Sequence, residues 1–359
     1  MARWRRLSSV AGLATGVAAA SAGAVIAAEK IAVGRIRLRP DPEADEPFGQ
    51  LRGRPVPVIA DDGVRLHAEV SGPEKAPVTM VFCHGYTLNQ DVWHYQRRDL
   101  SAQFRLVFWD QRGHGRSERG NPARNTIDQT GRDLAAVLAA TVPPKSPVVL
   151  VGHSMGGMSI MALADQQPEL FGTKVIGVAL ISTCACDVDG TGWVPGALRP
   201  MARRVGSPLL RTSSFGRLAE LTEWLRGASG DLAFLSTRFI AFGDPGVSPT
   251  VVDFLERVIR ATPIDIVTDF YLELLRVDKQ HVLNTIGRVP TVVIAGADDR
   301  LVPAAQTAAL AVAIPGARLV QDLDAGHMAL LEHPDVVTGE LAELAVAALD
   351  GVKARRRPA

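Results

Sequence analysis

The chain has 359 residues, of which 47% are hydrophobic and 21% charged, so it is neither disordered nor low in complexity and suits one large domain or two ordinary ones. Its formal net charge is +1, but residues 1–39 carry +6, residues 353–357 carry +4 and the remainder carries −9. A nucleic-acid-binding domain has its basic residues on the folded part, so nucleic acid is not expected as a partner. Basic ends instead suit a chain near an anionic membrane surface.

The N-terminal segment, residues 1–39, has features of a membrane segment. Residues 7–28 contain no charge and follow Arg3, Arg5 and Arg6. These 22 residues are long enough to span a bilayer, although Ala and Gly favour insertion less than Leu or Ile. A membrane anchor, a cleaved signal peptide and a peripheral helix all fit. We expect membrane association through residues 7–28 rather than secretion, and basic residues on both flanks leave the side of the membrane open.

Residues 40–54 are polar and Pro-rich, which is typical of a linker, so the folded domain is expected to begin near Pro55.

After this segment the chain alternates strands and helices. A hairpin is expected around Asp61-Asp62-Gly63, between strands at 56–60 and 64–70. Further strands are expected at 78–83, 106–109, 148–151 and 175–181, with a helix at 127–140.

The alternation resumes after residue 287, with strands expected at 291–295 and 317–321 and helices at 304–313 and 336–349. Continuous apolar strands separated by amphipathic helices predict an α/β fold, in which helices cover both faces of a mostly parallel sheet. Residues 55–186 and 288–352 would form the two parts of this core, and residues 353–359 a basic tail in solvent.

Residues 187–287 interrupt the alternation with a helical, irregular stretch. These 101 residues contain 9 of the 19 aromatic residues of the chain. An insertion after the carboxyl end of a strand lies where open α/β sheets bind ligands. We therefore predict a helical lid, whose aromatic side chains are shared between its own packing and an apolar pocket.

The chain has three cysteines, Cys83, Cys184 and Cys186. The last two are too close in sequence for an ordinary structural disulfide, and no His–Cys spacing typical of zinc surrounds them. We expect reduced thiols and no metal.

Small residues stand two positions before and after Ser154, in Gly152-His-Ser-Met-Gly156. This sequence follows the apolar strand at 148–151 and precedes a helical stretch to Gln167. Such a strand-to-helix turn lifts the hydroxyl out of the sheet, and the helix N-terminus favours negative charge beside it. Ser154 is therefore predicted to be a nucleophile.

A serine nucleophile needs a base, and the base needs an acid that orients it. His327 follows the expected strand at 317–321, and Asp298 and Asp299 follow the strand at 291–295. The order Ser, Asp, His, with each residue just past a strand, is typical of a Ser-His-Asp triad.

With these motifs the sequence resembles the α/β-hydrolase superfamily, in its lid-bearing serine esterase/lipase-like branch, over about residues 55–350. The resemblance is carried by His84-Gly85, Asp110-Gln-Arg-Gly-His-Gly-Arg-Ser117, the turn around Ser154, and Gly326-His327 with Leu331-Glu-His-Pro334. It implies the α/β-hydrolase fold.

The resemblance also bears on the catalytic residues. The acid of the family usually stands three residues after a Gly and four before a Pro, which favours Asp299 and leaves Asp298 as the alternative. The backbone N–H groups of Met155 and Tyr86 are expected to form the oxyanion hole. His153 is expected to pack beside the nucleophile and His84 to shape the oxyanion loop. The remaining histidines are expected to be structural: His67, His94, His114, His281 and His333.

We therefore predict a membrane-associated serine hydrolase that cleaves an apolar ester or related acyl compound through an acyl-enzyme, without a cofactor. Perhydrolase, cofactor-free haloperoxidase and carbon–carbon bond hydrolase chemistry use the same triad and remain alternatives. A ligand-binding protein that kept the fold and lost turnover is an alternative of another class. Epoxide hydrolases and haloalkane dehalogenases of this fold use Asp as nucleophile, so Ser154 disfavours those reactions.

Overall fold

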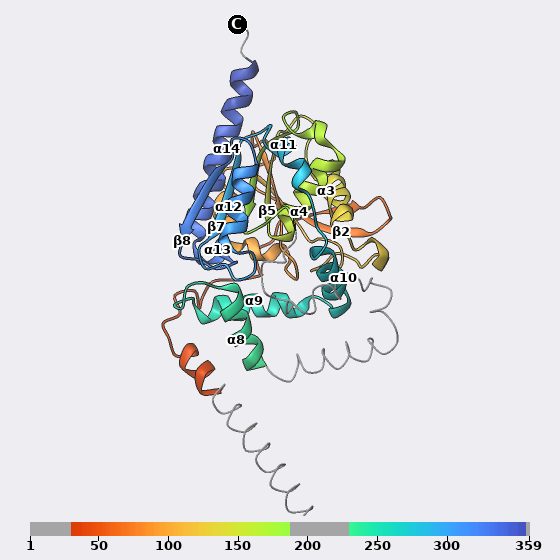
Figure 1. The fold of residues 1–359 in the computed structure, drawn as a ribbon. Coiled ribbons are helices and arrows are strands. Elements are labelled where there is room, and N and C mark those ends of the chain that lie inside the picture. The colour runs from red at the N-terminus through yellow and green to blue at the C-terminus, as the bar shows by residue number, and fades with distance from the viewer. Residues whose placement is uncertain (1–29, 187–229, 357–359) are drawn as a thin grey trace, which may run out of the picture.

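The computed structural model of the chain describes residues 30–186 and 230–356. An eight-stranded sheet runs through its centre, in the order β1-β2-β4-β3-β5-β6-β7-β8 (Figure 1). The strands are β1 (Arg54–Ile59), β2 (Arg65–Ser71), β3 (Thr79–Cys83), β4 (Arg105–Trp109), β5 (Val148–His153), β6 (Val175–Ile181), β7 (Thr291–Gly296) and β8 (Arg318–Leu323). All pairs from β4 to β8 are parallel, whereas β1 pairs with β2, and β2 with β4, in antiparallel fashion. The mostly parallel sheet is confirmed.

The hairpin forms where the sequence predicts it. The backbone N–H of Ala60 donates to the carbonyl of Val64 over 2.9 Å, and Gly63 has a φ of +87°, which glycine adopts without strain. Every other predicted strand lies within two residues of an observed one, because short apolar runs bounded by polar residues mark buried strands well.

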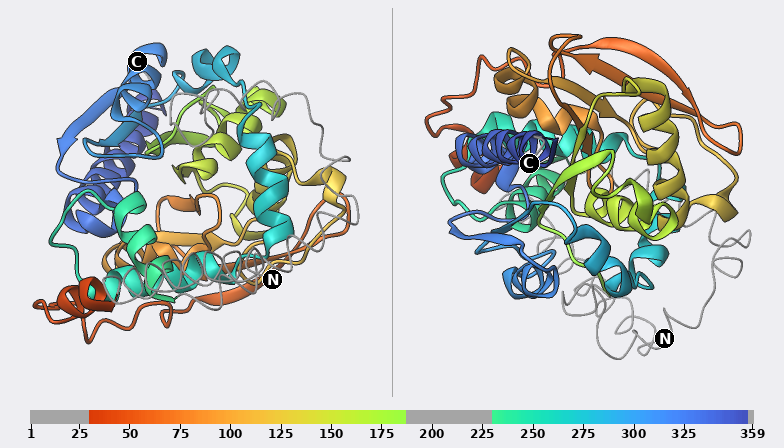
Figure 2. Two further views of the ribbon diagram at one scale, coloured as in Figure 1. Left: turned by 60° about the horizontal axis from the view of Figure 1, so that its bottom comes forward. Right: turned by 90° about the horizontal axis from the view of Figure 1, so that it is seen from above.

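Helices cover both faces of the sheet, as predicted (Figure 2). Apolar side chains of α3, α4, α11 and α12 pack on one face, and those of α2, α13 and α14 on the other. The core helices are α2 (His94–Leu100), α3 (Ile127–Thr141), α4 (Met155–Gln166), α11 (Leu283–Ile286), α12 (Ala304–Ala313), α13 (Ala329–Glu332) and α14 (Pro334–Arg356). Short 3₁₀ helices are η1 (Gln90–Trp93), η2 (Pro122–Arg124), η3 (Pro168–Leu170) and η5 (Gln280–Val282).

Part of the predicted lid, residues 230–287, is described. It contains α8 (Gly230–Ala241), α9 (Pro249–Ala261) and α10 (Ile264–Leu274), which lie at one end of the sheet, whereas η5 and α11, within the same predicted range, pack with α4 on a face of the sheet (Figure 1). This is the carboxyl end of the parallel strands, because the loop after β3 bonds to it: Thr262 Oγ1 donates to the carbonyl of Thr87 over 2.8 Å. The rest of the predicted lid, residues 187–229, lies outside the described residues.

Residues 40–53, which the sequence suggests as a linker, pack against the domain. Asp41 accepts hydrogen bonds from the hydroxyl groups of Ser248 and Thr250 at the start of α9. The Phe48 ring is buried and stacks on the Phe254 ring of α9, with centroids 4.8 Å apart. Asp41 and Phe48 therefore attach this segment to the lid, and the folded part of the chain begins before Pro55.

The structure shows no helix long and apolar enough to cross a bilayer between residues 30 and 186 or between 230 and 356. The expected membrane segment, residues 7–28, lies outside these ranges. Residues 30–37, just after it, form a short helix that leads into the packed segment at 40–53.

Candidate active site

Ser154 occupies a sharp turn between β5 and α4. Its φ of +52° is in a region that non-glycine residues rarely adopt, and the N–H of Ser154 donates to the carbonyl of Ile181 over 2.9 Å. A Cβ on Gly156 would lie 2.1 Å from the carbonyl oxygen of Cys83, and one on Gly152 would lie 2.6 Å from the nitrogen of Gly157. Both flanking glycines are therefore required, because the backbone is too closely packed for any side chain there.

His327 and Asp299 meet at the ends of two neighbouring strands. His327 Nδ1 lies 2.8 Å from Asp299 Oδ2, and because the carboxylate only accepts, the ring donates from Nδ1 and leaves Nε2 free to take a proton. Asp299 Oδ1 accepts from the N–H groups of Leu301 and Val302, which fixes the carboxylate. Asp299 is buried, whereas Asp298 is exposed and has no hydrogen bond to His327 among the contacts of the described residues.

The histidine next to Ser154 in sequence joins the turn to the His327 loop. His153 Nε2 lies 2.9 Å from the carbonyl oxygen of His327, and the two ring centroids are 4.8 Å apart. Because that oxygen only accepts, His153 carries its proton on Nε2. Burial is the main cause that lowers the pKa of His153 well below 6.5, so this ring is neutral and is no rival base at neutral pH.

The loop after β3, which contains Tyr86, is fixed by two buried histidines. The N–H of Gln111 donates to His84 Nε2 over 2.9 Å, so His84 carries its proton on Nδ1 and donates to the carbonyl of Gly85. The N–H of Thr87 donates to His114 Nε2 in the same way. Burial lowers the pKa of His84 to about 4 and that of His114 to about 3, which keeps both rings neutral and able to accept these bonds.

The side chain of Tyr86 points toward the lid, since its hydroxyl donates to the carbonyl of Val267 in α10. The carbonyl of Ser154, on the other side of the site, accepts from Thr183 Oγ1 over 2.8 Å. Both segments that carry the expected oxyanion donors, Tyr86 and Met155, are thus held by specific bonds at the carboxyl edge of the sheet.

Glu332 connects the His327 loop to the lid, a role that the sequence did not indicate. Its Oε1 accepts from the N–H of Gly326, directly before His327, over 2.7 Å. Its Oε2 accepts from the N–H groups of Gly243 and Asp244, just after α8, over 2.8 and 2.9 Å. The sequence feature that could have pointed to Glu332 is its position in the Leu331–Pro334 motif, five residues after His327.

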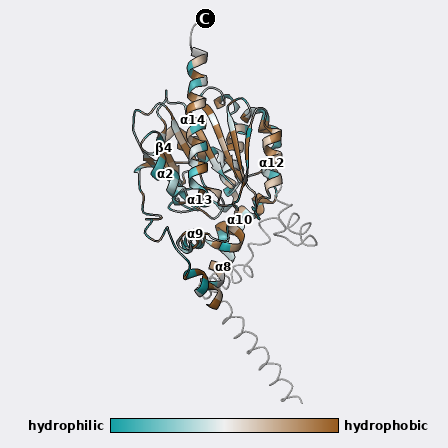
Figure 3. Ribbon diagram, turned by 90° about the vertical axis from the view of Figure 1, so that its left-hand side faces the viewer, coloured by the Kyte–Doolittle hydropathy of each residue, from teal (hydrophilic) through white to brown (hydrophobic). Residues whose placement is uncertain are grey.

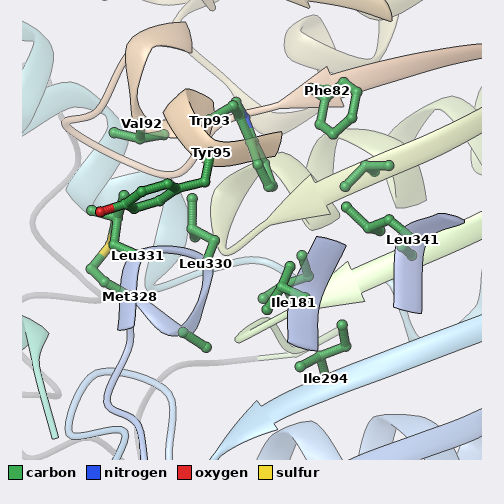
Figure 4. Packing of buried hydrophobic residues seen from close by; sticks show 14 of the residues in the cluster. Phe82, Val92, Trp93, Tyr95, Ile181, Ile294, Met328, Leu330, Leu331 and Leu341 are labelled. Atoms are coloured by element: carbon green, nitrogen blue, oxygen red, sulfur yellow. The ribbon is translucent and has the colours of Figure 1, made fainter. Parts of the chain in front are cut away.

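Apolar packing holds the same loop from its other side. Met328, Leu330 and Leu331 point toward the side chains of Trp93 and Tyr95 (Figure 4). The N–H of Met328 also donates to the carbonyl of Ala241 at the end of α8, over 3.1 Å. The loop is therefore anchored by the core on one side and by the lid on the other.

An apolar cluster lies beside the turn at Ser154. Met155 and Met158 of α4 pack with Ile266 and Phe270 of α10, and Tyr86 packs against this group. This cluster is buried and joins the lid to the start of α4, so the turn at Ser154 lies in apolar surroundings.

The three cysteines form no disulfide; Cys83 and Cys184 are buried and Cys186 is half-buried. Burial raises the pKa of Cys83 and of Cys184 to about 12, so both thiols stay protonated and unreactive. Within the described residues, no group of three or more His, Cys, Asp or Glu side chains could hold a metal ion.

Comparisons with known proteins agree with this architecture. Residues 78–334 match the family model of the alpha/beta hydrolase fold. The pimeloyl-[acyl-carrier protein] methyl ester esterase of Stenotrophomonas maltophilia is 31% identical over 283 residues, which covers 77% of this chain and 95% of that protein.

Solved structures share the fold. A thermophilic esterase from Thermogutta terrifontis aligns with a TM-score of 0.63 at 24% identity, over 82% of this chain and 98% of that one. The esterase RhEst1 from Rhodococcus sp. aligns with a TM-score of 0.63 at 22% identity, over 80% and 97%. With the sheet order and the matched residues together, the chain belongs to the α/β-hydrolase fold family and is an esterase-type hydrolase.

Proposed function

We propose that the chain is a serine carboxylesterase in which Ser154 is the nucleophile, His327 the general base and Asp299 the residue that orients His327. The observation that carries this proposal is the hydrogen bond of His327 Nδ1 to Asp299 Oδ2, over 2.8 Å. A second hydrogen bond ties His327 to the turn of Ser154, because His153, the residue before Ser154, donates from Nε2 to the carbonyl oxygen of His327. This arrangement directs the free Nε2 lone pair of His327 away from the carboxylate, as a base requires.

The reaction then follows from the positions of the groups. Ser154 Oγ attacks the ester carbonyl while His327 Nε2 accepts the hydroxyl proton. The N–H groups of Met155 and Tyr86 stabilise the oxyanion, each by roughly 3 kcal/mol. The alcohol leaves with the proton from His327, and a water molecule, deprotonated by His327, releases the acid from Ser154. No cofactor takes part.

The proposed substrate is an apolar ester of a small alcohol. The apolar surroundings of the turn, where the partly buried Tyr86 packs against the cluster of Met155, Met158, Ile266 and Phe270, support an apolar acyl chain. The methyl ester esterases among the relatives support a small alkoxy group. A methyl ester of a medium-chain acyl group, free or linked to a carrier, is therefore the first compound to assay.

Hydrolysis of p-nitrophenyl esters of graded chain length tests the chemistry. We expect Ser154→Ala to lower kcat by a factor of about 10⁴ or more with the protein still folded, because no other group replaces the nucleophile. Wild-type turnover in Ser154→Ala would overturn the assignment. Peroxide and diketone substrates in the same assay separate perhydrolase and carbon–carbon hydrolase chemistry from ester hydrolysis.

We also propose that the protein is membrane-associated through residues 7–28. The uncharged stretch lies between Arg3, Arg5 and Arg6 on one side and the basic residues of 30–39 on the other, which is typical of a segment held at a bilayer. Fractionation of cells, followed by extraction with carbonate, tests this localisation: recovery of the full-length chain in the soluble fraction would contradict it.

A further inference from the structure

The end of the molecule formed by residues 30–39 and α8 exposes large apolar side chains. Ile31 is 56% exposed, Leu38 is 88% exposed and Phe239 is 66% exposed. Ile31, Arg35 and Leu38 recur every three or four residues, so they share one side of the helix and its C-terminal turn. Single exposed apolar residues are common, but three on two adjoining segments need an explanation.

The two segments adjoin through specific contacts. Arg37 lies over the ring of Phe234 in α8, 5.3 Å from its centroid. Arg39 and Arg238 both donate to the carbonyl of Pro245. Val33, on the opposite side of the short helix from Leu38, is buried. Residues 30–39 and α8 therefore form one end of the molecule, which we call the α8 end; Ile31 and Leu38 lie on its first segment, and Phe239 lies on α8, where Arg300 packs over its ring at 4.6 Å from the centroid.

The α8 end is basic, although most of the chain is acidic. It carries Lys30, Arg35, Arg37, Arg39 and Arg238. Asp231 is the one acid that residues 30–39 and α8 contain among them. Of the acids nearby, Asp244 follows α8 close to Arg238, Asp253 pairs with Arg37 over 3.1 Å, and Asp41 accepts from Ser248 and Thr250. Residues 40–352, by contrast, carry a net charge of −9.

From this combination we propose that the α8 end binds the surface of an anionic lipid bilayer. Cationic side chains meet the lipid headgroups, while Leu38, Ile31 and Phe239 enter the boundary with the acyl chains. A second copy of this chain would present the same basic surface and be repelled. Only Glu29 separates the uncharged residues 7–28 from Lys30, so in the sequence the expected membrane segment leads directly into this surface, which favours a bilayer over an acidic protein.

The proposal fixes the orientation of the enzyme. The C-terminal end of α14 lies at the opposite end of the molecule from α8 (Figures 1 and 3). The lid would thus face the bilayer and the basic C-terminal tail would face away from it. An apolar ester dissolved in the bilayer would then reach the lid directly. The binding surface itself does not depend on the ester chemistry of the proposed function.

The test uses tryptophan as a reporter of depth in the full-length chain. Leu38→Trp is compared with Val312→Trp on α12, because Val312 is 87% exposed and Leu38 is 88% exposed. Each is mixed with vesicles of phosphatidylglycerol and brominated phosphatidylcholine, and the emission of the unsubstituted chain is subtracted. We expect brominated lipid to quench the Leu38→Trp signal at least severalfold more than the Val312→Trp signal.

Charge is tested with Lys30→Gln and Arg35→Gln, separately and together. We expect each to weaken binding to anionic vesicles by roughly fivefold, with little effect on zwitterionic vesicles and none on hydrolysis of a soluble ester. Equal quenching at positions 38 and 312 would overturn the proposal. An emission spectrum of Leu38→Trp that is typical of a buried indole before vesicles are added would also overturn the proposal. In that case residues 187–229, another protein or a second copy would cover the surface. Ester hydrolysis is measured separately, so a failure here leaves the proposed function standing.

Discussion

At the scale of single residues, the structure distinguishes the two neighbouring aspartates that could orient His327. Asp299 is buried, bonds His327 and accepts two backbone N–H groups, whereas Asp298 is exposed. The resemblance to the hydrolase family favoured Asp299, but the sequence left Asp298 open as the alternative. The distinction comes from the two N–H groups of Leu301 and Val302, which turn one carboxylate inward.

Asp299→Asn and Asp298→Asn make the same chemical change at adjacent positions. We expect Asp299→Asn to lower kcat by about 10³- to 10⁴-fold, because the amide no longer fixes the tautomer of His327 or stabilises its charged form. Asp298→Asn is expected to stay within about threefold of wild type. Steady-state hydrolysis of a p-nitrophenyl ester measures both, and a larger loss in Asp298→Asn would reverse the assignment.

At the scale of elements, the strands were predictable and the contacts that join distant segments were not. Strands such as β3 and β6 are continuous apolar runs, which are visible locally. Residues 40–53 resemble a linker in sequence, because their contacts are with residues far away in the chain. Asp41, for example, bonds Ser248, which is 207 residues away. The short helix α2 was not predicted either, since its buried face consists largely of polar residues such as Gln96 and Arg97.

In the site, too, the residues that follow strands could be predicted, whereas the contacts between distant segments could not. Ser154, His327 and Asp299 follow strands and carry recognisable motifs, so their places could be predicted. Glu332 was part of a quoted motif, yet its function as a link became visible only when the lid backbone at Gly243 lay beside it. Tertiary contacts of backbone N–H groups leave no trace in the sequence.

Glu332→Gln tests whether the lid positions His327. A glutamine amide keeps one accepting oxygen and replaces the other with a donor, so one of the two backbone segments loses its partner. We expect kcat to fall about tenfold with a smaller change in KM, and the pH profile of kcat to shift, because the loop of His327 is displaced. Glu340→Gln on α14, where Glu340 pairs with Arg318 near the surface, is the matched control and should remain close to wild type.

A purely structural role for Glu332 would give a different result. In that case the melting temperature would fall, but kcat per folded molecule and its pH profile would be unchanged. Activity must therefore be measured at a temperature where circular dichroism shows the variant to be fully folded.

At the scale of the whole molecule, the buried histidines predict how stability depends on pH. The pKa of His84 is lowered to about 4 and that of His114 to about 3, from 6.5, by burial. As the pH falls from 7 to 5, the unfolded chain binds protons at these positions and the native chain does not. The free energy of unfolding should therefore fall over this range, by about 2 kcal/mol for each ring.

Urea unfolding at pH 7 and pH 5 measures this dependence. His114→Asn should reduce the difference between the two pH values, because asparagine does not titrate. An unchanged or larger difference in that variant would show that His114 is accessible to protons in the folded protein.

The proposed reaction requires Ser154 to be a nucleophile that His327 activates. A fluorophosphonate reacts only with an activated serine, so the modified residue can be identified by peptide mass spectrometry in the wild type and in His327→Ala. We expect a single modified residue, Ser154, and loss of the reaction when His327 is removed. Modification of a different residue, or labelling of Ser154 at the same rate without His327, would contradict it.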